Sequence, residues 1–131
     1  MTMHRILVVD DEVALARTVA LNLEDTGRFE VAVANNGTEA LDMAPRFRPD
    51  LILLDLMMPD MDGSEVAERL CADPLLRDVP VVFLTAVVAK AEVKAGGDMI
   101  GGRCFLAKPA RAEELVSCID NQLRRAAASQ R

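Results

Sequence analysis

The chain has 131 residues, 51% of them hydrophobic and 27% charged, so its length fits one domain and its composition indicates a folded core rather than disorder. It carries 15 Lys and Arg against 21 Asp and Glu, and the net charge of −6 is opposite to the field that holds nucleic-acid phosphates. We therefore expect no direct contact with nucleic acid. No apolar run approaches the roughly 18 residues of a membrane span, so we also expect no membrane contact.

The three cysteines, Cys71, Cys104 and Cys118, are an odd number without the Cys-x-x-Cys spacing of zinc or redox sites. Each lies in a segment of apolar pattern, which indicates small buried hydrophobic side chains rather than ligands. The number and spacing of the cysteines predict a reducing, cytoplasmic location.

The first half of the chain alternates between strand and helix patterns. Continuous apolar runs predict strands that are buried on both faces, and apolar residues spaced by three or four predict helices. A capping box at Asn36 and Glu39 predicts where the second helix begins, and Pro45 and Pro49 predict where it ends. The predicted elements of this half are a strand over 6–9, a helix over about 12–27, an edge strand over 29–34, a helix from 36 and a strand over 51–54.

The second half continues the alternation. Its predicted elements are a helix over about 64–73, a strand over 81–84, a weaker helix over about 88–99, a strand over 104–106 and a last helix around Leu115, Ile119 and Leu123. Five strands separated by helices predict a parallel sheet covered on both faces, which is a doubly wound α/β fold. We place one domain over residues 1–126 and a C-terminal tail over 127–131.

Polar side chains follow the predicted strands at the points where the strands end. They are Asp10 and Asp11 after the first strand, Asp55 after the third, Thr85 after the fourth and Lys108 after the fifth. Because ligands bind outside the carboxyl ends of parallel strands, we expect these five side chains to converge. Each residue alone is explained at least as well as a turn residue, a helix cap or a surface charge. Together they indicate a site.

Three carboxylates at one edge of a sheet repel one another, by roughly 4 kcal/mol for a pair about 4 Å apart at an effective dielectric of about 20. They stay ionised together only where a cation offsets that repulsion, and a single Lys108 is not enough for three negative charges. Mg²⁺ is the natural candidate, because it takes oxygen ligands, binds one or two carboxylates and keeps several waters. Such a site can hold a phosphoryl group, and one carboxylate can then act as the nucleophile.

Four segments together resemble the signature set of receiver domains of two-component response regulators, a group that includes the chemotaxis regulators. The segments are 8–12, 54–63, 84–86 and 105–109, which occur in the family's order. The resemblance covers nearly the whole chain, from about Arg5 to Arg125. It implies a flavodoxin-like (βα)5 domain with a parallel sheet of strand order 2-1-3-4-5.

The resemblance also implies a role for each acidic residue. Asp55 matches the phosphoacceptor, which takes a phosphoryl group from a phosphohistidine. Asp11, Asp55 and the backbone carbonyl of Met57 match the direct Mg²⁺ ligands, and Asp10 matches the residue that holds a metal-bound water. The expected cofactor is therefore Mg²⁺.

The remaining roles belong to residues of the last two strands. Thr85 matches the switch hydroxyl, Phe105 the switch aromatic residue and Lys108 the cation that contacts the phosphoryl group. Phe105 replaces the commoner Tyr, and Ala110 stands where many members carry Phe. The family implies a cis bond between Lys108 and Pro109, which the sequence alone does not reveal.

The expected partners are a sensor histidine kinase or phosphotransfer protein and a downstream protein target that the sequence does not identify. In the family, partners read the face formed by the helix over 88–99, the strand over 104–106 and the last helix, and this face also allows a homodimer. The Gly96-Gly97 pair is expected to soften the first of these helices. We expect no enzyme activity apart from self-catalysed phosphorylation and dephosphorylation of the aspartate.

Other functions fit less of the sequence. A phosphatase of the haloacid-dehalogenase type requires Asp-x-Asp after its first strand, where this chain has Asp10-Asp11-Glu12. A flavodoxin-like cofactor binder requires a phosphate-binding loop and an aromatic stack, and the chain has no such Gly-rich loop, no Trp and no Tyr. A receiver-like interaction scaffold that is never phosphorylated, and a receiver fragment of a larger regulator, stay as alternatives.

Two apolar side chains are expected to border the phosphorylation site. Met57 and Val87 lie two residues after the predicted phosphoacceptor and the switch Thr, positions that in receiver domains face the approach of the hydrolytic water. Neither side chain can orient that water by a hydrogen bond, so we expect a long-lived phosphorylated state.

Overall fold

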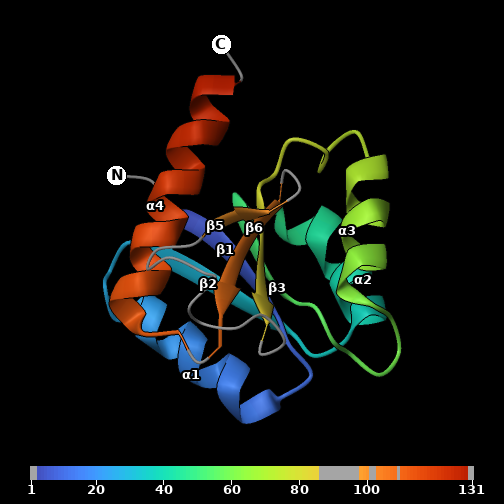
Figure 1. Cartoon of the computed structure of the whole chain (residues 1–131), viewed down its shortest axis with the longest axis horizontal. Coiled ribbons are helices and arrows are strands. Elements are labelled where there is room, and N and C mark those ends of the chain that lie inside the picture. Colours follow the sequence, from blue (N-terminus) through green and yellow to red (C-terminus); the bar gives the residue numbers. More distant parts are fainter. Residues whose placement is uncertain (1–2, 86–97, 101–102, 109, 130–131) are drawn as a thin grey trace.

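The continuous apolar runs form the central strands of one sheet in the computed structural model, which describes residues 3–85, 98–100, 103–108 and 110–129. The strands are β1 (His4–Val9), β2 (Phe29–Ala34), β3 (Leu51–Asp55), β4 (Val81–Thr85), β5 (Asp98–Ile100) and β6 (Arg103–Ala107). They lie in the order β2-β1-β3-β4-β6-β5 (Figure 1). Every neighbouring pair is parallel except β5 with β6. The five parallel strands therefore have the predicted order 2-1-3-4-5, which confirms the doubly wound fold.

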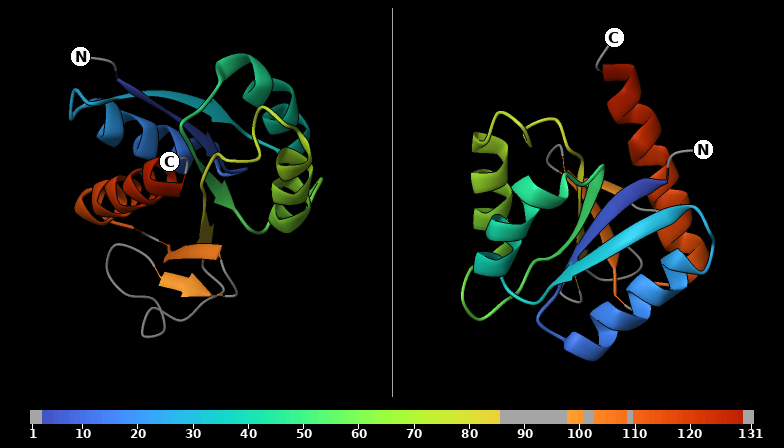
Figure 2. Two further views of the ribbon diagram at one scale, coloured as in Figure 1. Left: turned by 90° about the horizontal axis from the view of Figure 1, so that it is seen from above. Right: turned by 180° about the vertical axis from the view of Figure 1, so that it is seen from behind.

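Helices of the described residues cover both faces of the sheet, as the two views of Figure 2 show. The helices are α1 (Val13–Glu24), α2 (Gly37–Phe47), α3 (Gly63–Ala72) and α4 (Ala112–Ser129). α1 and α4 lie together on one face, and α2 and α3 lie together on the other. None of the described helices combines the length and the apolar character needed to cross a bilayer.

The two-sided burial explains why the central strands are apolar at every position. Along β1, Ile6 and Val8 pack in the core on the α1–α4 side, and Leu7 and Val9 pack in the core on the α2–α3 side. β3 alternates in the same way, and all five of its residues are buried. A strand with solvent on one face would have shown alternating polar positions instead.

The second helix continues past the proline that was expected to end it. α2 runs through Pro45 to Phe47, and its start at Asn36 is as predicted, because the Asn36 side chain accepts a hydrogen bond from the Glu39 N–H at 2.8 Å. Ala44 is fully buried and Phe47 packs beside it on the α2–α3 side, so tertiary packing outweighs the cost of proline in this last turn. The helix ends at Arg48, whose φ of 55° is left-handed.

The helix predicted over 88–99 is wrong at its C-terminal end, because Asp98–Ile100 forms strand β5. Ile100 pairs with Arg103 in antiparallel register, so two residues separate the paired strands, and in the sequence both are glycine. Gly-Gly between two strands favours a hairpin over a helix. The remainder of the predicted helix, with Gly96 and Gly97, lies outside the described residues.

The last helix is longer than its sequence pattern indicates. α4 continues to Ser129, whereas the sequence predicts a C-terminal tail from residue 127. The run of alanines at 126–128 lacks the apolar spacing of a buried face, but alanine is the best helix former and extends the helix. The domain boundary at residue 126 stays a prediction.

Gly63 joins the end of β3 to the start of α3 by a close backbone approach. Its N–H donates to the Leu56 carbonyl at 2.9 Å. A Cβ at this position would lie 2.5 Å from the Asp55 carbonyl oxygen and 2.8 Å from the Leu56 Cα. Both neighbours are backbone atoms, which cannot rotate away as a flexible side chain can.

We therefore predict that Gly63→Ala lowers the free energy of unfolding by about 1–3 kcal/mol, because the backbone of β3 or α3 must shift to admit the methyl group. Urea denaturation measures the change. Ser64→Ala is the matched control, since Ser64 is the next residue of the helix and is exposed. It should change the stability by less than about 0.5 kcal/mol. Equal stabilities of the two variants would contradict the prediction.

Candidate functional site

The register of the sheet brings the carboxyl ends of four parallel strands to one edge. It pairs Val9 with Leu54, Asp55 with Leu84 and Thr85 with Ala107. Asp10 directly follows β1 and Lys108 directly follows β6. The polar residues predicted to converge therefore stand at neighbouring strand ends.

The three aspartates form one cluster. Carboxylate oxygens of Asp10, Asp11 and Asp55 all lie within 4.8 Å of one another. Asp10 and Asp55 are buried, and Asp11 is exposed. The cluster offers only oxygen ligands, and its exposed member leaves one side open to solvent. This donor set fits a hard divalent cation such as Mg²⁺, which prefers carboxylate oxygens and keeps part of its water shell.

Lys108 is the cation that the structure places against the buried carboxylates. Its Nζ lies 2.8 Å from Asp10 Oδ2, 3.5 Å from Asp55 Oδ2 and 3.4 Å from Glu12 Oε1. The Lys108 side chain is only 10% exposed. An ion pair with this little water is screened far less than a surface pair, so its loss would leave buried negative charge uncompensated.

The environment shifts the pKa of both Asp55 and Lys108. Burial, followed by the negative charge of Asp10, raises the pKa of Asp55 to about 6, although Lys108 and the Met57 N–H act in the opposite direction. Burial alone would lower the pKa of Lys108, but the hydrogen bond and charge of Asp10 and the charges of Asp55 and Glu12 raise it. The site therefore favours the protonated form of Asp55 and the charged form of Lys108.

Short backbone turns hold the two buried aspartates in place. The Asp10 carboxylate accepts a hydrogen bond from the Glu12 N–H at 3.0 Å, and the Asn35 side chain donates to the Asp10 carbonyl at 3.1 Å. The Asp55 carboxylate accepts from the Met57 N–H at 3.4 Å. Each aspartate is thus oriented by the backbone two residues after it, which is the local geometry that Asp favours at the start of a turn.

The other predicted site residues have different surroundings. Thr85 is fully buried at the end of β4. Phe105 is partly buried on the α2–α3 side, where its ring stacks on Phe83 with a centroid distance of 5.2 Å. Met57 is 65% exposed. Val87 and Pro109 lie outside the described residues.

Two residues near this edge have structural roles that the sequence interpretation did not assign. Glu12 pairs with Lys108, and its place directly after Asp11 was the available signal. Asp60 accepts hydrogen bonds at 3.1 Å from the N–H groups of Gly37 and Thr38 and from the Thr38 hydroxyl, which fixes the loop after β3 to the start of α2. These hydrogen bonds lower the pKa of Asp60. No local signal predicts contacts across 22 residues of sequence.

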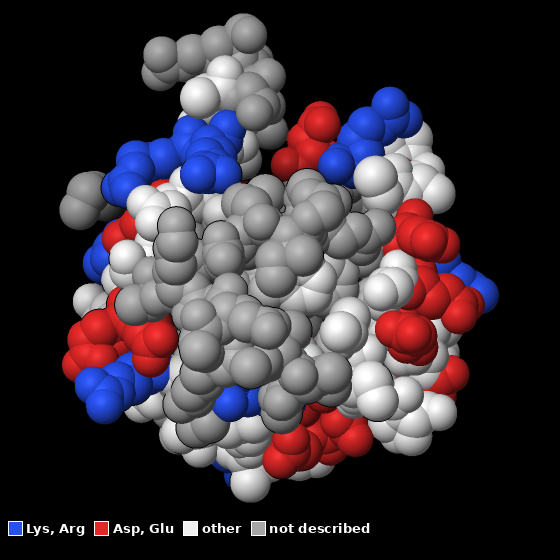
Figure 3. Space-filling model, viewed as in Figure 1, with Lys and Arg blue, Asp and Glu red and all other residues white. Residues whose placement is uncertain are grey.

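Charge on the visible surface is mixed. Figure 3 shows acidic side chains on the side formed by α2 and α3 and along the lower edge, and a group of basic side chains at the upper left beside α4. This distribution agrees with the net charge of −6.

Comparison with known proteins gives concordant matches. The family model "Response regulator receiver domain" matches residues 6–120. The DNA-binding response regulator MtrA of Mycobacterium tuberculosis is 42% identical over 122 residues, which cover 93% of this chain and 51% of that protein. The DNA-binding dual master transcriptional regulator RpaA of Synechocystis is 39% identical over 123 residues, which cover 94% of this chain and 50% of that protein. The crystal structure of the chemotaxis protein CheY4 of Vibrio cholerae has a TM-score of 0.78 and 32% identity, covering 92% of this chain and 98% of that one.

The chain spans about half the length of the curated relatives that it matches. DNA binding belongs to the names of those longer proteins, so the comparisons do not support the expectation of no direct nucleic-acid contact, which stays a prediction. The solved structure, in contrast, is covered almost completely. Since one family model accounts for residues 6–120 and a solved structure that is covered to 98% shares the fold, the chain belongs to the receiver domain family of response regulators.

Proposed function

We propose that this chain is a phosphoacceptor receiver domain in which Asp55 takes a phosphoryl group from a phosphohistidine of a sensor histidine kinase or phosphotransfer protein. The observation that carries the proposal is the position of the Asp55 carboxylate. It is buried, it shares a cluster with Asp10 and Asp11, and one of its oxygens lies 3.5 Å from Lys108 Nζ. A carboxylate in this position is both a nucleophile and part of a cation site.

The transfer needs an ionised carboxylate and a means of balancing the charge of the phosphoryl group. One Asp55 oxygen attacks phosphorus, the bond from phosphorus to the donor imidazole nitrogen breaks, and the imidazole leaves with its electron pair and is protonated. With a pKa of about 6, Asp55 is mostly ionised at neutral pH. Lys108 is close enough to donate to a phosphoryl oxygen, and we assign the Thr85 hydroxyl the same role once the group is in place.

Asp10, Asp11 and Asp55 are the residues that would hold Mg²⁺, with the backbone carbonyl of Met57 as a further ligand. Receiver domains bind this ion at an acidic pocket, and the three carboxylates provide the oxygen donors for it. The bound ion would supply positive charge against the carboxylates and the phosphoryl oxygens. Asp10 is already paired with Lys108 at 2.8 Å, which fits a residue that contacts the ion through water.

We assign the conformational response to phosphorylation to Thr85 and Phe105. Phosphorylation would draw Thr85 toward the phosphoryl group and move Phe105 inward, a shift between populations of one fold. We assign the downstream target to a protein that reads the face formed by residues 88–99, β6 and α4, of which 88–97 lie outside the described residues, and we assign a homodimer to the same face. A classical catalytic turnover is not part of the proposal, and a cytoplasmic location stays a prediction from the cysteine pattern.

A second candidate is the same receiver acting as the regulatory part of a longer DNA-binding regulator. The observation that favours it is the length of the relatives, of which the match covers only about half. The chemistry at Asp55 is the same in both cases, so the experiments below test the function that the two candidates share.

We predict that a small phosphodonor phosphorylates Asp55 only in the presence of Mg²⁺. Intact-mass spectrometry detects the adduct, and peptide mapping locates it. Asp55→Asn should lose the adduct, because it removes the nucleophile. Asp78→Asn is the matched control, since Asp78 is an exposed aspartate that precedes β4 and lies away from the cluster. An adduct that persists in Asp55→Asn, or that forms equally in excess chelator, would exclude the proposed chemistry.

The raised pKa of Asp55 predicts a pH dependence of stability in metal-free buffer. The carboxyl has a pKa of 3.8 in the unfolded chain and about 6 in the folded chain, so the folded chain binds the proton more tightly. The free energy of unfolding should therefore fall as the pH rises through this window, by about 1–3 kcal/mol. Below the window both states are protonated and the loss disappears.

Urea denaturation in chelator at about pH 4 and about pH 7 measures this loss. Asp55→Asn should remove most of it, and added Mg²⁺ should restore stability at the higher pH. Asp78→Asn again serves as the control and should keep the wild-type profile. A wild-type profile in Asp55→Asn would show that Asp55 is not the group responsible.

The apolar character of the Met57 side chain predicts a slow loss of the phosphoryl group, because this side chain cannot form a hydrogen bond with the hydrolytic water. A hydrogen-bonding side chain at position 57 would orient the hydrolytic water, so Met57→Asn together with Val87→Glu should shorten the lifetime of the phosphorylated state. Radiolabel decay measures the lifetime, and Met57→Leu with Val87→Leu keeps both positions apolar as a control. An unchanged decay rate in the polar variant would show that other groups set the lifetime.

A further inference from the structure

A second reactive cluster lies away from the aspartates, between the sheet and the last helix. Cys104 of β6 and Cys118 of α4 have their sulfur atoms 3.7 Å apart. Both residues are buried, Cys104 with 3% of its surface exposed and Cys118 with none. They are 14 residues apart in sequence, and only the packing of α4 onto β6 brings them together.

We propose that Cys104 and Cys118 form an oxidisable dithiol that closes to an intrachain disulfide when a peroxide is the oxidant. The two sulfurs are already in contact. A disulfide needs a sulfur–sulfur distance of about 2.0 Å, which a rotation of the two side chains and a small movement of the helix can supply. The two cysteines belong to elements that pack in the same core on the α1–α4 side, so that arrangement holds them together.

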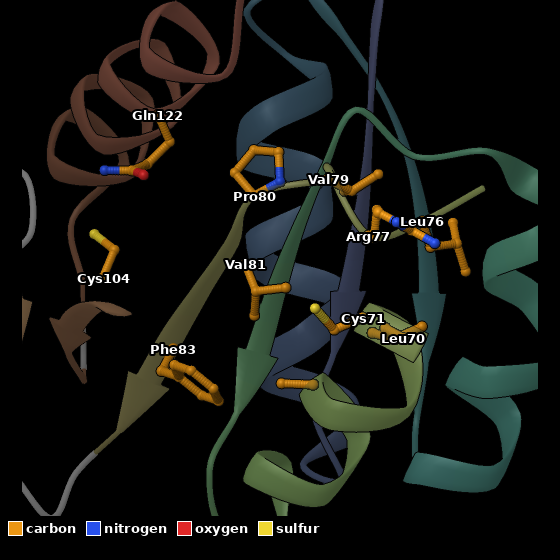
Figure 4. Close-up of a pocket in the computed structure, with 11 residues that line it drawn as sticks. Leu70, Cys71, Leu76, Arg77, Val79, Pro80, Val81, Phe83, Cys104 and Gln122 are labelled. Atoms are coloured by element: carbon orange, nitrogen blue, oxygen red, sulfur yellow. The ribbon is translucent and has the colours of Figure 1, made fainter. Parts of the chain in front are cut away.

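Access for a small oxidant comes from the neighbouring pocket. Cys104 lines a pocket of about 290 Å³, with Phe83 and Pro80 on its sheet side and Gln122 of α4 beside it (Figure 4). Cys118 does not line this pocket. A molecule as small as hydrogen peroxide therefore meets Cys104 first, and Cys118 is placed to react second.

The chemistry balances in two steps. The Cys104 sulfur attacks one peroxide oxygen, the oxygen–oxygen bond breaks, and the products are a sulfenic acid on Cys104 and one water. The Cys118 sulfur then attacks the sulfur of that sulfenic acid, and its hydroxyl leaves as a second water with the Cys118 proton. In sum, the two thiols lose two electrons and two protons, and the peroxide is reduced to water.

The state of Cys118 fits the second step. The hydrogen bond with Cys104, together with burial, raises the pKa of the Cys118 thiol above its usual range. At neutral pH Cys118 is thus a thiol that does not react alone. Its contact with Cys104 makes it reactive toward the sulfenic acid, because the two groups are held together rather than meeting by diffusion.

A bond between these residues would tie β6 to α4. Cys104 directly precedes Phe105, so the bond would fix the strand whose aromatic side chain we expect to move. That consequence rests on the proposed function, whereas formation of the bond does not. The bond is measured by mass, so its failure and the failure of phosphorylation at Asp55 are separate results.

The test treats the folded chain with a series of hydrogen peroxide concentrations and blocks the remaining thiols before analysis. Trypsin cleavage after arginine places Cys104 in peptide 104–111, Cys118 in peptide 112–124 and Cys71 in peptide 70–77. We expect the first two peptides to be joined, with a mass lower by two hydrogen atoms and separable by reductant. Cys71 is the internal control, because it is exposed and lines the same pocket as Cys104.

Two variants sharpen the result. Cys71→Ser should keep the joined peptides, and its melting temperature should rise by about 5–10 °C on oxidation, because the bond closes a short loop. Cys118→Ser should instead accumulate a sulfenic acid on Cys104 that a dimedone probe captures. The proposal is overturned if Cys104 stays reduced at concentrations that oxidise Cys71 fully, or if Cys104 joins Cys71 instead. It is also overturned if the bond forms only in urea, or if oxidation lowers the melting temperature.

Discussion

Electrostatic repulsion among Asp10, Asp11 and Asp55 is the constraint on which the site depends. Oxygens of the three carboxylates lie within 4.8 Å of one another, and two of the carboxylates are buried. Lys108 offsets part of this negative charge, because its Nζ lies 2.8 Å from Asp10 Oδ2 and 3.5 Å from Asp55 Oδ2. Burial first, and then the negative charge of Asp10, raises the pKa of Asp55, so the metal-free site favours a proton on this carboxyl. The negative charge of the three carboxylates can then be reduced by a proton on Asp55 or neutralised by a metal ion. When Asp55 is phosphorylated, the metal ion would also offset the charge of the phosphoryl group.

The fold supplies the rigidity that this constraint needs. Parallel strands buried on both faces hold their carboxyl ends in fixed register, and the short turns after β1 and β3 orient the aspartates by backbone hydrogen bonds. Gly63 lets α3 begin close to the backbone of β3, and Asp60 fixes the intervening loop to α2. The carboxylates cannot move apart without loss of this packing, so they stay close together despite their electrostatic repulsion.

The central strands and the main site residues were predictable because each has a local signal. Two-sided burial produces continuous apolar runs, and the polar residue directly after each run marks the edge where ligands bind. The predictions for the end of α2 and for residues 98–99 were wrong, because tertiary contacts there outweigh the local structural preference of the sequence. The packing of Ala44 and Phe47 stabilises α2 beyond Pro45. Residues 98–100 pair with β6 and form an antiparallel edge strand instead of the predicted helix end.

The contacts that the sequence did not predict join residues that are distant along the chain. The pairing of Glu12 with Lys108, the capping of α2 by Asp60 and the thiol contact of Cys104 with Cys118 depend on how elements pack, not on any spacing within one element. Cys104 and Cys118 were correctly predicted to be small buried side chains, but burial alone does not show which side chains are neighbours. For Cys71 the same prediction is wrong, because it is exposed on α3.

The pKa of Asp55 is the most direct measure of how burial and the negative charge of Asp10 act together on the central carboxylate. A carboxyl-carbon NMR titration of the metal-free chain, with Asp55→Asn to assign the signal, gives that value without reference to stability or phosphorylation. We predict a pKa of about 6 that falls when Mg²⁺ is added. A pKa near the ordinary aspartate value of 3.8 in the metal-free chain, unchanged by Mg²⁺, would contradict the account.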